Sequence, residues 1–517
     1  MEFVAEQEGM SVTKYANNGA CVMPGHPIDE EGLGGMILED QIRKAAEDGL
    51  DPDYVVFDGG TNDAYAPVME KLGDAEEACR ALYAPYGGSG SGASDGSALC
   101  DTFYHTFAGA FAGTVDTIQK NWPRAKVVYV AAHRLGYRDR AVQEALHRIE
   151  MNICAHMGVA AADLYDDCAL DTADEAMCRE YSFDVLRDGL PAPGEEPTGT
   201  HPNFEAIREF YLPLVSEVLR KAEVFRFSGI SWDAQDHEIM LYWELPEGEQ
   251  KGDVYEVWLD GAKAGETEKT HFGLEGLEED RVYEVCLRAV RNGEELQRAR
   301  FYCRTKKGKT RIDVTQAPYF AKGDGETVNT EALQRAIDDC APDQAVYFPE
   351  GVYMTGSLNL HSDMELYLDK GAVLKGTAEP DDYLPRRWSR FEGTEMECLS
   401  GLLNLGEVDH TAGPTSRNVV IRGGGTIEGG GRLLAERVIE AERERLKDYL
   451  AELGSRIEEY ENADTIPGRV RPRLLHICNA ENISIHNVTL KNGASWNVHM
   501  IYSQDIVTYG CHFRSRN

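Results

Sequence analysis

Three residues within the first 201 positions are of the types that acyl transfer uses. Asn62 follows the apolar run 54–57 within a Gly-Thr-Asn-Asp sequence, His201 begins a His-Pro-Asn sequence, and Gly19 follows two asparagines. A histidine can accept the proton of a serine nucleophile, while an amide side chain and a backbone N–H can stabilise the oxyanion that forms. Each residue alone would be an ordinary turn or helix-start residue, but together they favour a hydrolase.

Such side chains need a rigid framework, and the sequence predicts one. The runs 54–57 and 126–130 are short, apolar and rich in β-branched residues, which is typical of buried strands. Helical spacing of apolar residues recurs around them, near 37–49, 102–120, 139–157 and 203–222. Strands that alternate with helices predict an α/β domain with a parallel, doubly wound sheet over residues 1–222.

The motifs around Gly19, Asn62 and His201 occur in the order of blocks II, III and V of the SGNH (GDSL-type) hydrolases. Residues 1–222 therefore resemble this family. The resemblance implies a flavodoxin-type sheet and an esterase-like activity, with His201 as the base and with Asn62 and Gly19 as oxyanion donors.

Two positions depart from the family pattern. The family's nucleophile lies in a Gly-Asp-Ser block ahead of block II, and this tripeptide does not occur in the chain. The family's aspartate three residues before its histidine is replaced by Thr198, which leaves Glu195 or Glu196 as substitutes. The pattern predicts that the family's first strand, with its serine, is missing from the N-terminal end.

Residues 224–307 contain short runs in which apolar and polar residues largely alternate, a pattern typical of a small β-sandwich. Short, largely alternating strands are expected at 239–243, 255–259 and 283–287, with hairpin turns at Asp260-Gly261 and Asn292-Gly293. Tyr283 follows Leu277 at the spacing of a tyrosine corner, and Trp243 lies in an early strand. The segment resembles a fibronectin type III module, for which we expect a spacer role.

In residues 311–517 the spacing of the predicted strands differs from that in the two preceding segments. Short apolar strands begin with Asn or Asp at Asn418, Asn482 and Asp505, and the last two begin 23 residues apart. Rungs of this length predict a right-handed parallel β-helix, in which Asn at the turns tolerates left-handed backbone and can bond the next rung. A generic β-sandwich is the alternative. Residues 432–461 predict an amphipathic helix inserted between rungs and packed on the solenoid.

The same segment resembles family 28 glycoside hydrolases, the polygalacturonase group. The resemblance is carried by motifs at 320–325, 329–337, 346–353, 356–358, 425–429, 471–475 and 495–499. It implies an inverting glycosidase that acts on pectin, in which one acid protonates the leaving oxygen and other carboxylates activate water. The family's Asn-Thr-Asp, Asp-Asp, Gly-His-Gly and Arg-x-Lys motifs do not occur after His499. The resemblance therefore predicts that the chain is the interior of a longer protein.

Composition restricts the possible partners. With 52 basic and 89 acidic residues the net charge is -37, which argues against nucleic acid and anionic membranes. An anionic polysaccharide would need local positive charge, for which Arg469, Arg471 and Arg473 are candidates; solvated surface residues are the alternative. The 12 cysteines form no C-x-x-C pair, so we expect free thiols and neither a metal nor a cofactor.

The joint prediction is a pectin- or galacturonan-degrading hydrolase with an attached esterase-like domain, while this chain itself lacks key catalytic residues. Two alternatives stay open: a noncatalytic polysaccharide-binding protein, and a carbohydrate acetylesterase that acts alone through an unusually placed serine. No signal peptide is visible, which predicts a cytoplasmic protein as the sequence stands, or a secreted one if the true N-terminus lies further upstream. The oligomeric state is not predicted.

Overall fold

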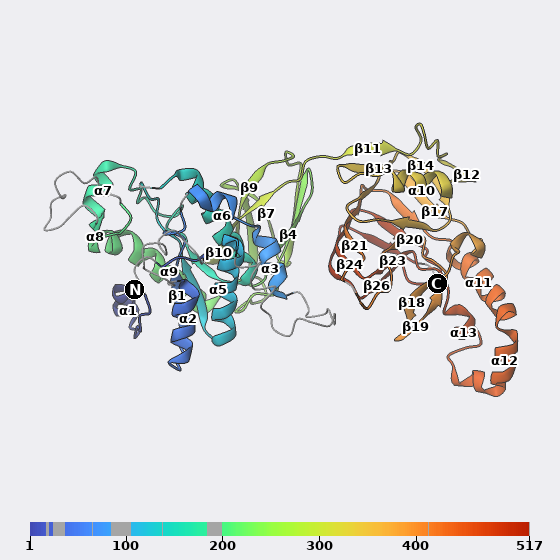
Figure 1. The fold of residues 1–517 in the computed structure, drawn as a ribbon, viewed down its shortest axis with the longest axis horizontal. Coiled ribbons are helices and arrows are strands. Elements are labelled where there is room, and N and C mark those ends of the chain that lie inside the picture. The colour runs from blue at the N-terminus through green and yellow to red at the C-terminus, as the bar shows by residue number, and fades with distance from the viewer. Residues whose placement is uncertain are drawn as a thin grey trace. The chain divides into compact units, whose positions relative to one another are not determined.

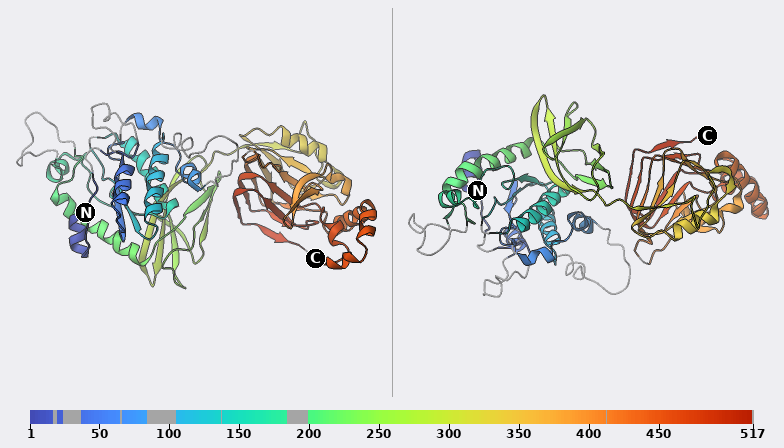
Figure 2. Two further views of the ribbon diagram at one scale, coloured as in Figure 1. Left: turned by 60° about the horizontal axis from the view of Figure 1, so that its bottom comes forward. Right: turned by 90° about the horizontal axis from the view of Figure 1, so that it is seen from above.

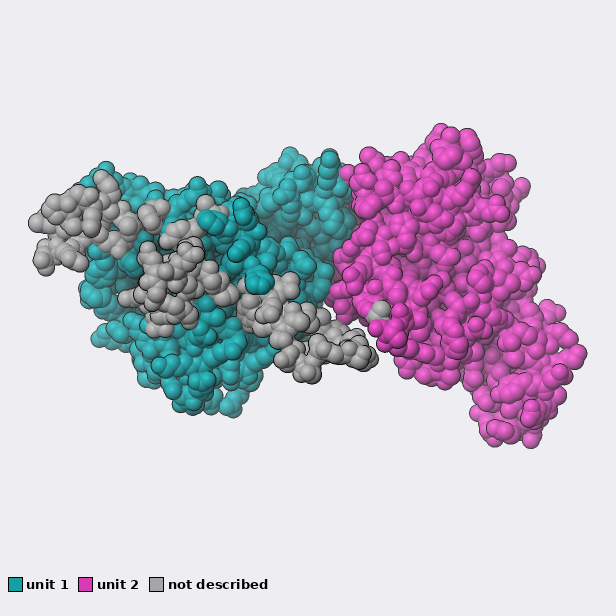
Figure 3. Space-filling view, viewed as in Figure 1, with its two compact units in different colours: residues 1–86, 92–307 teal, residues 87–91, 308–517 magenta. Residues whose placement is uncertain are grey.

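The computed structural model describes residues 1–16, 20–23, 37–64, 66–83, 105–136, 138–183, 199–411 and 413–515. The chain forms two compact units, which Figure 3 colours separately. Unit 1 comprises Met1–Tyr86 with Gly92–Lys307, and unit 2 contains Gly308–Asn517. The predictions for Gly19, Thr198, Glu195 and Glu196 lie outside the described residues.

Unit 1 begins with a three-stranded parallel sheet. Its strands are β1 (Tyr54–Asp58), β2 (Lys126–Val130) and β3 (Ala160–Ala162), paired in the order β1-β2-β3. The helices labelled in Figure 1 are α1 (Glu2–Glu8), α2 (Leu38–Glu47), α3 (Ala75–Tyr83), α5 (Phe107–Asn121), α6 (Arg140–Met157), α7 (Glu175–Tyr181), α8 (Phe204–Ala206) and α9 (Leu212–Val224).

Alternate residues of the strands are buried in two different cores. Val127 and Tyr129 of β2 pack with α2, α3, α5 and α6. Val128 and Val130, which point the other way, pack with Val4 of α1 and with apolar residues of α9. Since successive side chains of a strand point to opposite faces, helices cover both faces of the sheet, as the α/β pattern predicted.

Two antiparallel sheets follow, which we call the two-sheet module. One sheet contains β4 (Ser231–Ala234), β5 (Glu238–Tyr242) and β8 (His271–Glu275); the other contains β6 (Val254–Leu259), β7 (Ala262–Thr267), β9 (Val282–Arg291) and β10 (Glu294–Arg304). They enclose one core, where Trp232 stacks on Phe301 with centroids 5.0 Å apart. Tyr283 Oη accepts a 2.7 Å hydrogen bond from the Glu278 N–H, the contact expected of a tyrosine corner.

The two-sheet module packs directly on the α/β part of unit 1. Asn152 of α6 exchanges two hydrogen bonds with the backbone of Tyr302 in β10, at 2.9 and 2.7 Å. His156 of α6 stacks on Trp232 at 4.4 Å. The sequence predicted a spacer, whereas these buried contacts join the module to α6 within one compact unit.

Unit 2 is a coil of parallel strands, and Figure 2 shows its stacked rungs. The first sheet contains β11 (Thr310–Asp313), β13 (Gln344–Phe348), β16 (Glu365–Leu368), β21 (Ser416–Arg422), β24 (Ala480–His486) and β27 (Gln504–Tyr509). The second contains β12 (Asp324–Val328), β14 (Gly351–Thr355), β17 (Ala372–Gly376), β22 (Thr426–Glu428), β25 (Thr489–Lys491) and β28 (His512–Arg514). The third contains β15 (Leu358–Leu360), β20 (Leu403–Leu405), β23 (Leu475–Cys478) and β26 (Val498–Ile501). The predicted parallel β-helix is confirmed.

The turn asparagines stack from rung to rung. Asn418 and Asn482 both have φ 56, and Asp505 has φ 53. Asn482 Nδ2 donates to Asn418 Oδ1 at 2.7 Å, and Asn418 Nδ2 donates to Asp363 Oδ1 at 2.6 Å. These residues form the ladder that the spacing of Asn and Asp predicted, because asparagine tolerates the left-handed backbone and still offers an amide to its neighbour.

Two insertions leave the coil at the same corner, between a strand of the second sheet and a strand of the third. The first carries the hairpin β18 (Arg387–Phe391) and β19 (Thr394–Cys398). The second carries α11 (Gly431–Arg445), α12 (Lys447–Leu453) and α13 (Thr465–Gly468). The single helix predicted over 432–461 is therefore two helices that meet at Leu446, followed by a 3₁₀ turn at Gly454–Glu459.

The 11 cysteines in the described part of the chain form no disulfide bond with one another, and most are buried. Among the described residues, no helix combines the length and apolar composition needed to cross a bilayer.

Candidate functional site

Asn62 lies in the turn that follows β1. Its Nδ2 donates a 2.9 Å hydrogen bond to the Ala20 carbonyl oxygen, so the turn holds the segment that directly follows Gly19. The neighbouring Asp63 carboxylate accepts 2.9 Å hydrogen bonds from the N–H groups of Val22 and Met23. The structure thus brings two of the three predicted motifs together at the end of β1, although Gly19 itself is outside the described residues.

His201 is exposed and is positioned through its backbone. Its carbonyl oxygen accepts hydrogen bonds from the Phe183 N–H at 2.8 Å and from Ser182 Oγ at 3.3 Å. Two residues upstream, the Gly199 carbonyl oxygen lies 3.1 Å from Nε2 of buried His133. His133, which follows β2, was not predicted as a site residue; it connects the end of the sheet to the segment before His201.

A second group of side chains gathers in unit 2, at the corner where the insertions leave the coil. His476 of β23 and His499 of β26 are neighbours in register, with stacked rings 5.3 Å apart. Trp496 stacks on His499 at 5.0 Å with 9° between the planes, and Phe391 of the hairpin lies 5.4 Å from Trp496. Two rungs and one insertion therefore build a continuous column of rings.

Arginines surround this column. The Arg473 guanidinium lies 5.3 Å from the Trp496 ring, and that of Arg469 lies 5.9 Å from the Phe391 ring. Arg473 is 1% exposed and donates to the carbonyl oxygens of Arg471 and Arg390 at 3.0 and 3.3 Å. We call Arg469, Arg471, Arg473, His476, Trp496, His499 and Phe391 the arginine–aromatic site.

The charge of this site is unbalanced. Within the described residues, none of Arg469, Arg471 and Arg473 forms an ion pair with a carboxylate, in a chain whose net charge is -37. Nε of Arg469 and of Arg473 is buried without a hydrogen-bond partner among those residues. Buried cations without counter-charges are costly, so this arrangement is best suited to an anion from solution.

The two histidines of the site are neutral at ordinary pH. Burial lowers the pKa of His476 to about 3, with help from the charges of His499, Arg387 and Arg473. Burial and the charge of Arg473 lower the pKa of His499 to about 4. The positive charge therefore comes from the arginines, while the imidazoles serve as flat surfaces and hydrogen-bonding groups.

One carboxylate lies at the edge of this group. Glu395 of β19 accepts hydrogen bonds from Tyr502 Oη at 2.5 Å and from His410 Nε2 at 2.7 Å. These two contacts lower the pKa of Glu395, so it stays ionised and is poorly suited to donate a proton. They also tie the hairpin to the strand that precedes Tyr502.

Comparison with known proteins shows that this chain is similar to pectin-acting proteins. Residues 317–379 match the family described as "Rhamnogalacturonase A/epimerase, pectate lyase-like". An exo-poly-α-D-galacturonosidase of Dickeya chrysanthemi is 25% identical over 352 residues, covering 57% of this chain and 56% of that protein. A probable polygalacturonase of Vitis vinifera is 28% identical over 194 residues, covering 36% of this chain and 34% of that protein.

The solved family 28 exopolygalacturonase of Yersinia enterocolitica is 21% identical, with a TM-score of 0.45 over 55% of this chain and 59% of its own. The chain spans between about a third and somewhat over half of the length of the curated relatives. The polygalacturonase-like features predicted from the sequence are confirmed by these relatives. The SGNH and fibronectin type III resemblances stay predictions.

Proposed function

We propose that this chain is part of a pectin-degrading glycoside hydrolase that binds a galacturonan-type polymer at the arginine–aromatic site. The single observation that carries the proposal is the group of arginines without counter-charges beside Trp496 and His499. Galacturonan offers one carboxylate per sugar, which guanidinium groups bind in a planar, bidentate way. Its sugar rings can pack on the exposed part of Trp496. The polygalacturonase relatives support the same substrate class.

The finer parts of this proposal follow the sequence resemblance. Cleavage would proceed with inversion, on a right-handed coil, with one acid that protonates the leaving oxygen and carboxylates that activate water. The described part contributes substrate binding: Arg469 and Arg471 hold carboxylates, buried Arg473 lies against the Trp496 ring, and the hairpin β18–β19 brings Phe391 against the ring column. The two-sheet module would be of the fibronectin type III kind.

Binding to polygalacturonate tests the proposal. We expect Arg469→Met and Trp496→Ala each to weaken the Kd for polygalacturonate by roughly tenfold or more, since each removes a charge-assisted or stacking contact worth about 1.4 kcal/mol or more. Arg432→Ala, which removes an exposed arginine from α11, is the matched control. Raising the salt concentration should weaken binding, and fully methyl-esterified pectin should bind poorly.

Equal affinity of both variants and the wild type would contradict this site. Reducing-end release from polygalacturonate distinguishes the enzyme from a noncatalytic binding protein. Release of reducing ends would favour the enzyme, and binding without release would favour the noncatalytic binding protein.

We also propose that the α/β part is an esterase-like module of the SGNH kind, with His201 as base and with Asn62 and Gly19 as oxyanion donors. The contact between Asn62 and Ala20 supports it, because it brings two of the motifs to one sheet edge. The test is acetate release from an acetylated aryl ester. We expect loss of activity in His201→Ala and not in His237→Ala, a histidine of the two-sheet module. Absence of release by the wild type would refute the esterase.

A further inference from the structure

A polar pocket of about 480 Å³ lies in unit 1, where the α/β part meets the two-sheet module. Its wall comes from four separate segments: the residues after β2, helix α6, the residues after β3, and strands β9 and β10. This volume lies within the range of small-molecule sites, which are commonly found at junctions between domains. None of the proposals above uses this pocket, which we call the interface pocket.

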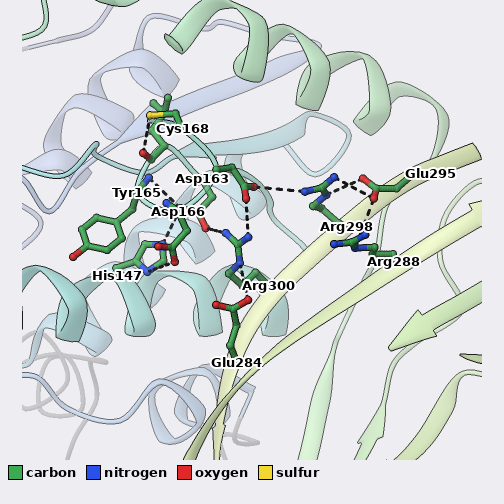
Figure 4. Close-up of polar contacts among 12 residues, drawn as sticks. His147, Asp163, Tyr165, Asp166, Cys168, Glu284, Arg288, Glu295, Arg298 and Arg300 are labelled. Atoms are coloured by element: carbon green, nitrogen blue, oxygen red, sulfur yellow. Dashed lines mark hydrogen bonds and ion pairs between the residues drawn. The ribbon is translucent and has the colours of Figure 1, made fainter. Parts of the chain in front are cut away.

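A network of hydrogen bonds and ion pairs around Asp163 forms the base of the interface pocket (Figure 4). Asp163 is 3% exposed and accepts hydrogen bonds from His147 Nε2 at 2.9 Å and from two backbone N–H groups, and it also pairs with Arg300 of β10. Arg300 binds Asp167 as well, at 2.6 Å. Burial would raise the pKa of Asp163, but His147 and Arg300 outweigh it and lower that pKa to about 2. This network fixes the ring of His147 and joins both parts of unit 1.

Tyr165 forms one wall of the interface pocket, and its hydroxyl group lacks a hydrogen bond of ordinary geometry within the described residues. Its ring stacks on His147 at 4.7 Å, and the guanidinium groups of Arg134 and Arg140 lie 5.3 and 5.9 Å from its centroid. Tyr165 is only 6% exposed, and neither its Oη nor the buried Nη1 of Arg140 forms a hydrogen bond of ordinary geometry within the described residues. The two side chains interact with each other, and this interaction raises the pKa of Arg140. A polar group of a ligand placed beside them would complete the hydrogen bonding of both atoms.

The charged side chains of the interface pocket indicate which class of ligand it can bind. Arg134 pairs with Asp166 at 2.9 Å, and Arg140 pairs with Asp171 at 2.8 Å through Nη2. Arg148 lies over the ring of Tyr302 at 5.7 Å and forms no ion pair within the described residues. One guanidinium is therefore uncommitted, and Arg140 retains a second donor nitrogen.

Carboxylates complete the lining. Glu144 of α6 and Glu284 of β9 face the same pocket; Glu284 also pairs with Nε of Arg300 at 3.6 Å. They can accept hydrogen bonds from hydroxyl groups, and they repel ligands that carry several negative charges. An apolar ligand would offer no partner to Arg148, to Nη1 of Arg140 or to Glu144. The lining therefore fits a molecule with one carboxylate and several hydroxyl groups.

We propose that the interface pocket binds a sugar acid of one or two rings, separately from the arginine–aromatic site. The carboxylate lies against Arg148 and Arg140 Nη1, Tyr165 Oη donates to or accepts from the ligand, and hydroxyl groups donate to Glu144 and Glu284. This assignment follows from the lining of the pocket and does not depend on the activity proposed above.

Calorimetric titration of the full chain with galacturonate and with galactose tests the proposal. Tyr165→Phe removes only the hydroxyl group, and Arg148→Ala removes the uncommitted cation; Arg124→Ala, whose side chain is 86% exposed on the same unit, is the control. We expect the galacturonate Kd to rise about fivefold in Tyr165→Phe and about tenfold or more in Arg148→Ala. It should not change in the control, and galactose should bind at least tenfold more weakly than galacturonate.

Repeating the titration in Trp496→Ala separates the two sites. Galacturonate binding that persists in Trp496→Ala and weakens about tenfold or more in Arg148→Ala supports the interface pocket even if polymer binding fails. The proposal is overturned by the absence of binding to the wild type, by equal affinity for galactose, or by variants of Tyr165 and Arg148 that bind like the wild type. Circular dichroism of each variant verifies that it is folded.

Discussion

Glu150 of α6 shows how burial acts on a single residue. It is 5% exposed and lies beneath the turn after β1, where a side chain on Gly60 would collide with its carboxylate. Burial raises its pKa to about 7, although the charge of His147 and a hydrogen bond with Tyr129 act in the opposite direction. The same turn positions Asn62, so the protonation of Glu150 bears on the predicted acyl-transfer residues.

A pH prediction follows from this pKa. Between its ordinary value of 4.5 and about 7 the folded protein keeps the Glu150 proton that the unfolded chain releases, so stability falls as pH rises through this window. The side chain of Glu150→Gln does not titrate, so the free energy of unfolding of this variant should not fall over the same pH range. The difference in the free energy of unfolding between Glu150→Gln and the wild type should therefore grow by about 3 kcal/mol between pH 4.5 and pH 8.

Hydrogen exchange of the α6 amides, compared between variant and wild type at each pH, measures the difference. Glu144→Gln, on the exposed side of the same helix, is the control and should show no such trend. A constant difference between Glu150→Gln and the wild type across the pH range would contradict the prediction.

At the scale of elements, the rungs of unit 2 depend on their turns. Asn418 and Asn482 combine a left-handed backbone with a hydrogen bond to the rung before, and both roles were predictable from the asparagines at the starts of apolar runs. The ring column was not predicted, although one signal was present. His476 and His499 are 23 residues apart, the same separation as Asn482 and Asp505, which places both pairs on neighbouring rungs.

Phe391 and the interface pocket had no comparable signal. Phe391 reaches the column from a hairpin more than eighty residues upstream. The pocket combines segments from two folding modules whose pairing no periodicity indicates. Local patterns therefore predicted elements and rung spacing, while contacts across insertions and between modules required the folded chain.

Asn482 provides the test at this scale. Asn482→Ala should destabilise unit 2 by about 1–2 kcal/mol, because alanine is strained at φ 56 and cannot donate to Asn418. Asn482→Gly keeps the backbone conformation and loses only the amide, so it should cost about half as much. Urea denaturation of the three proteins measures these values. An alanine variant as stable as the glycine variant would show that the backbone conformation contributes nothing.

At the scale of the whole molecule, the chain consists of two compact units that meet at Lys307 and Gly308 in the sequence. Each has its own buried core: α/β and two-sheet cores in unit 1, and one continuous core along the coil of unit 2. The segment 306–309 has the sequence Lys-Lys-Gly-Lys, a composition that favours a linker, and the boundary between the units falls within it.

A cleavable version of this boundary tests the independence of the units. A site-specific protease sequence inserted between Lys307 and Gly308 should be cut without loss of folded signal, because each core lies on one side of the cut. Two products that retain native circular dichroism, with polygalacturonate binding only by unit 2, are expected. Unfolding of either product on cleavage would contradict the prediction, and the uncut insertion variant is the control.

The corner where both insertions leave the coil has a consequence for how binding surfaces of this kind can diversify. Strand pairing in all three sheets continues past the hairpin β18–β19 and past the helices α11–α13 without a change of register. The register of the rungs therefore does not depend on either excursion, although Leu434 and Val438 of α11 pack in the core of the coil. Exchanging the hairpin for one of different reach should reshape the surface around Trp496 while the stack beneath it stays the same.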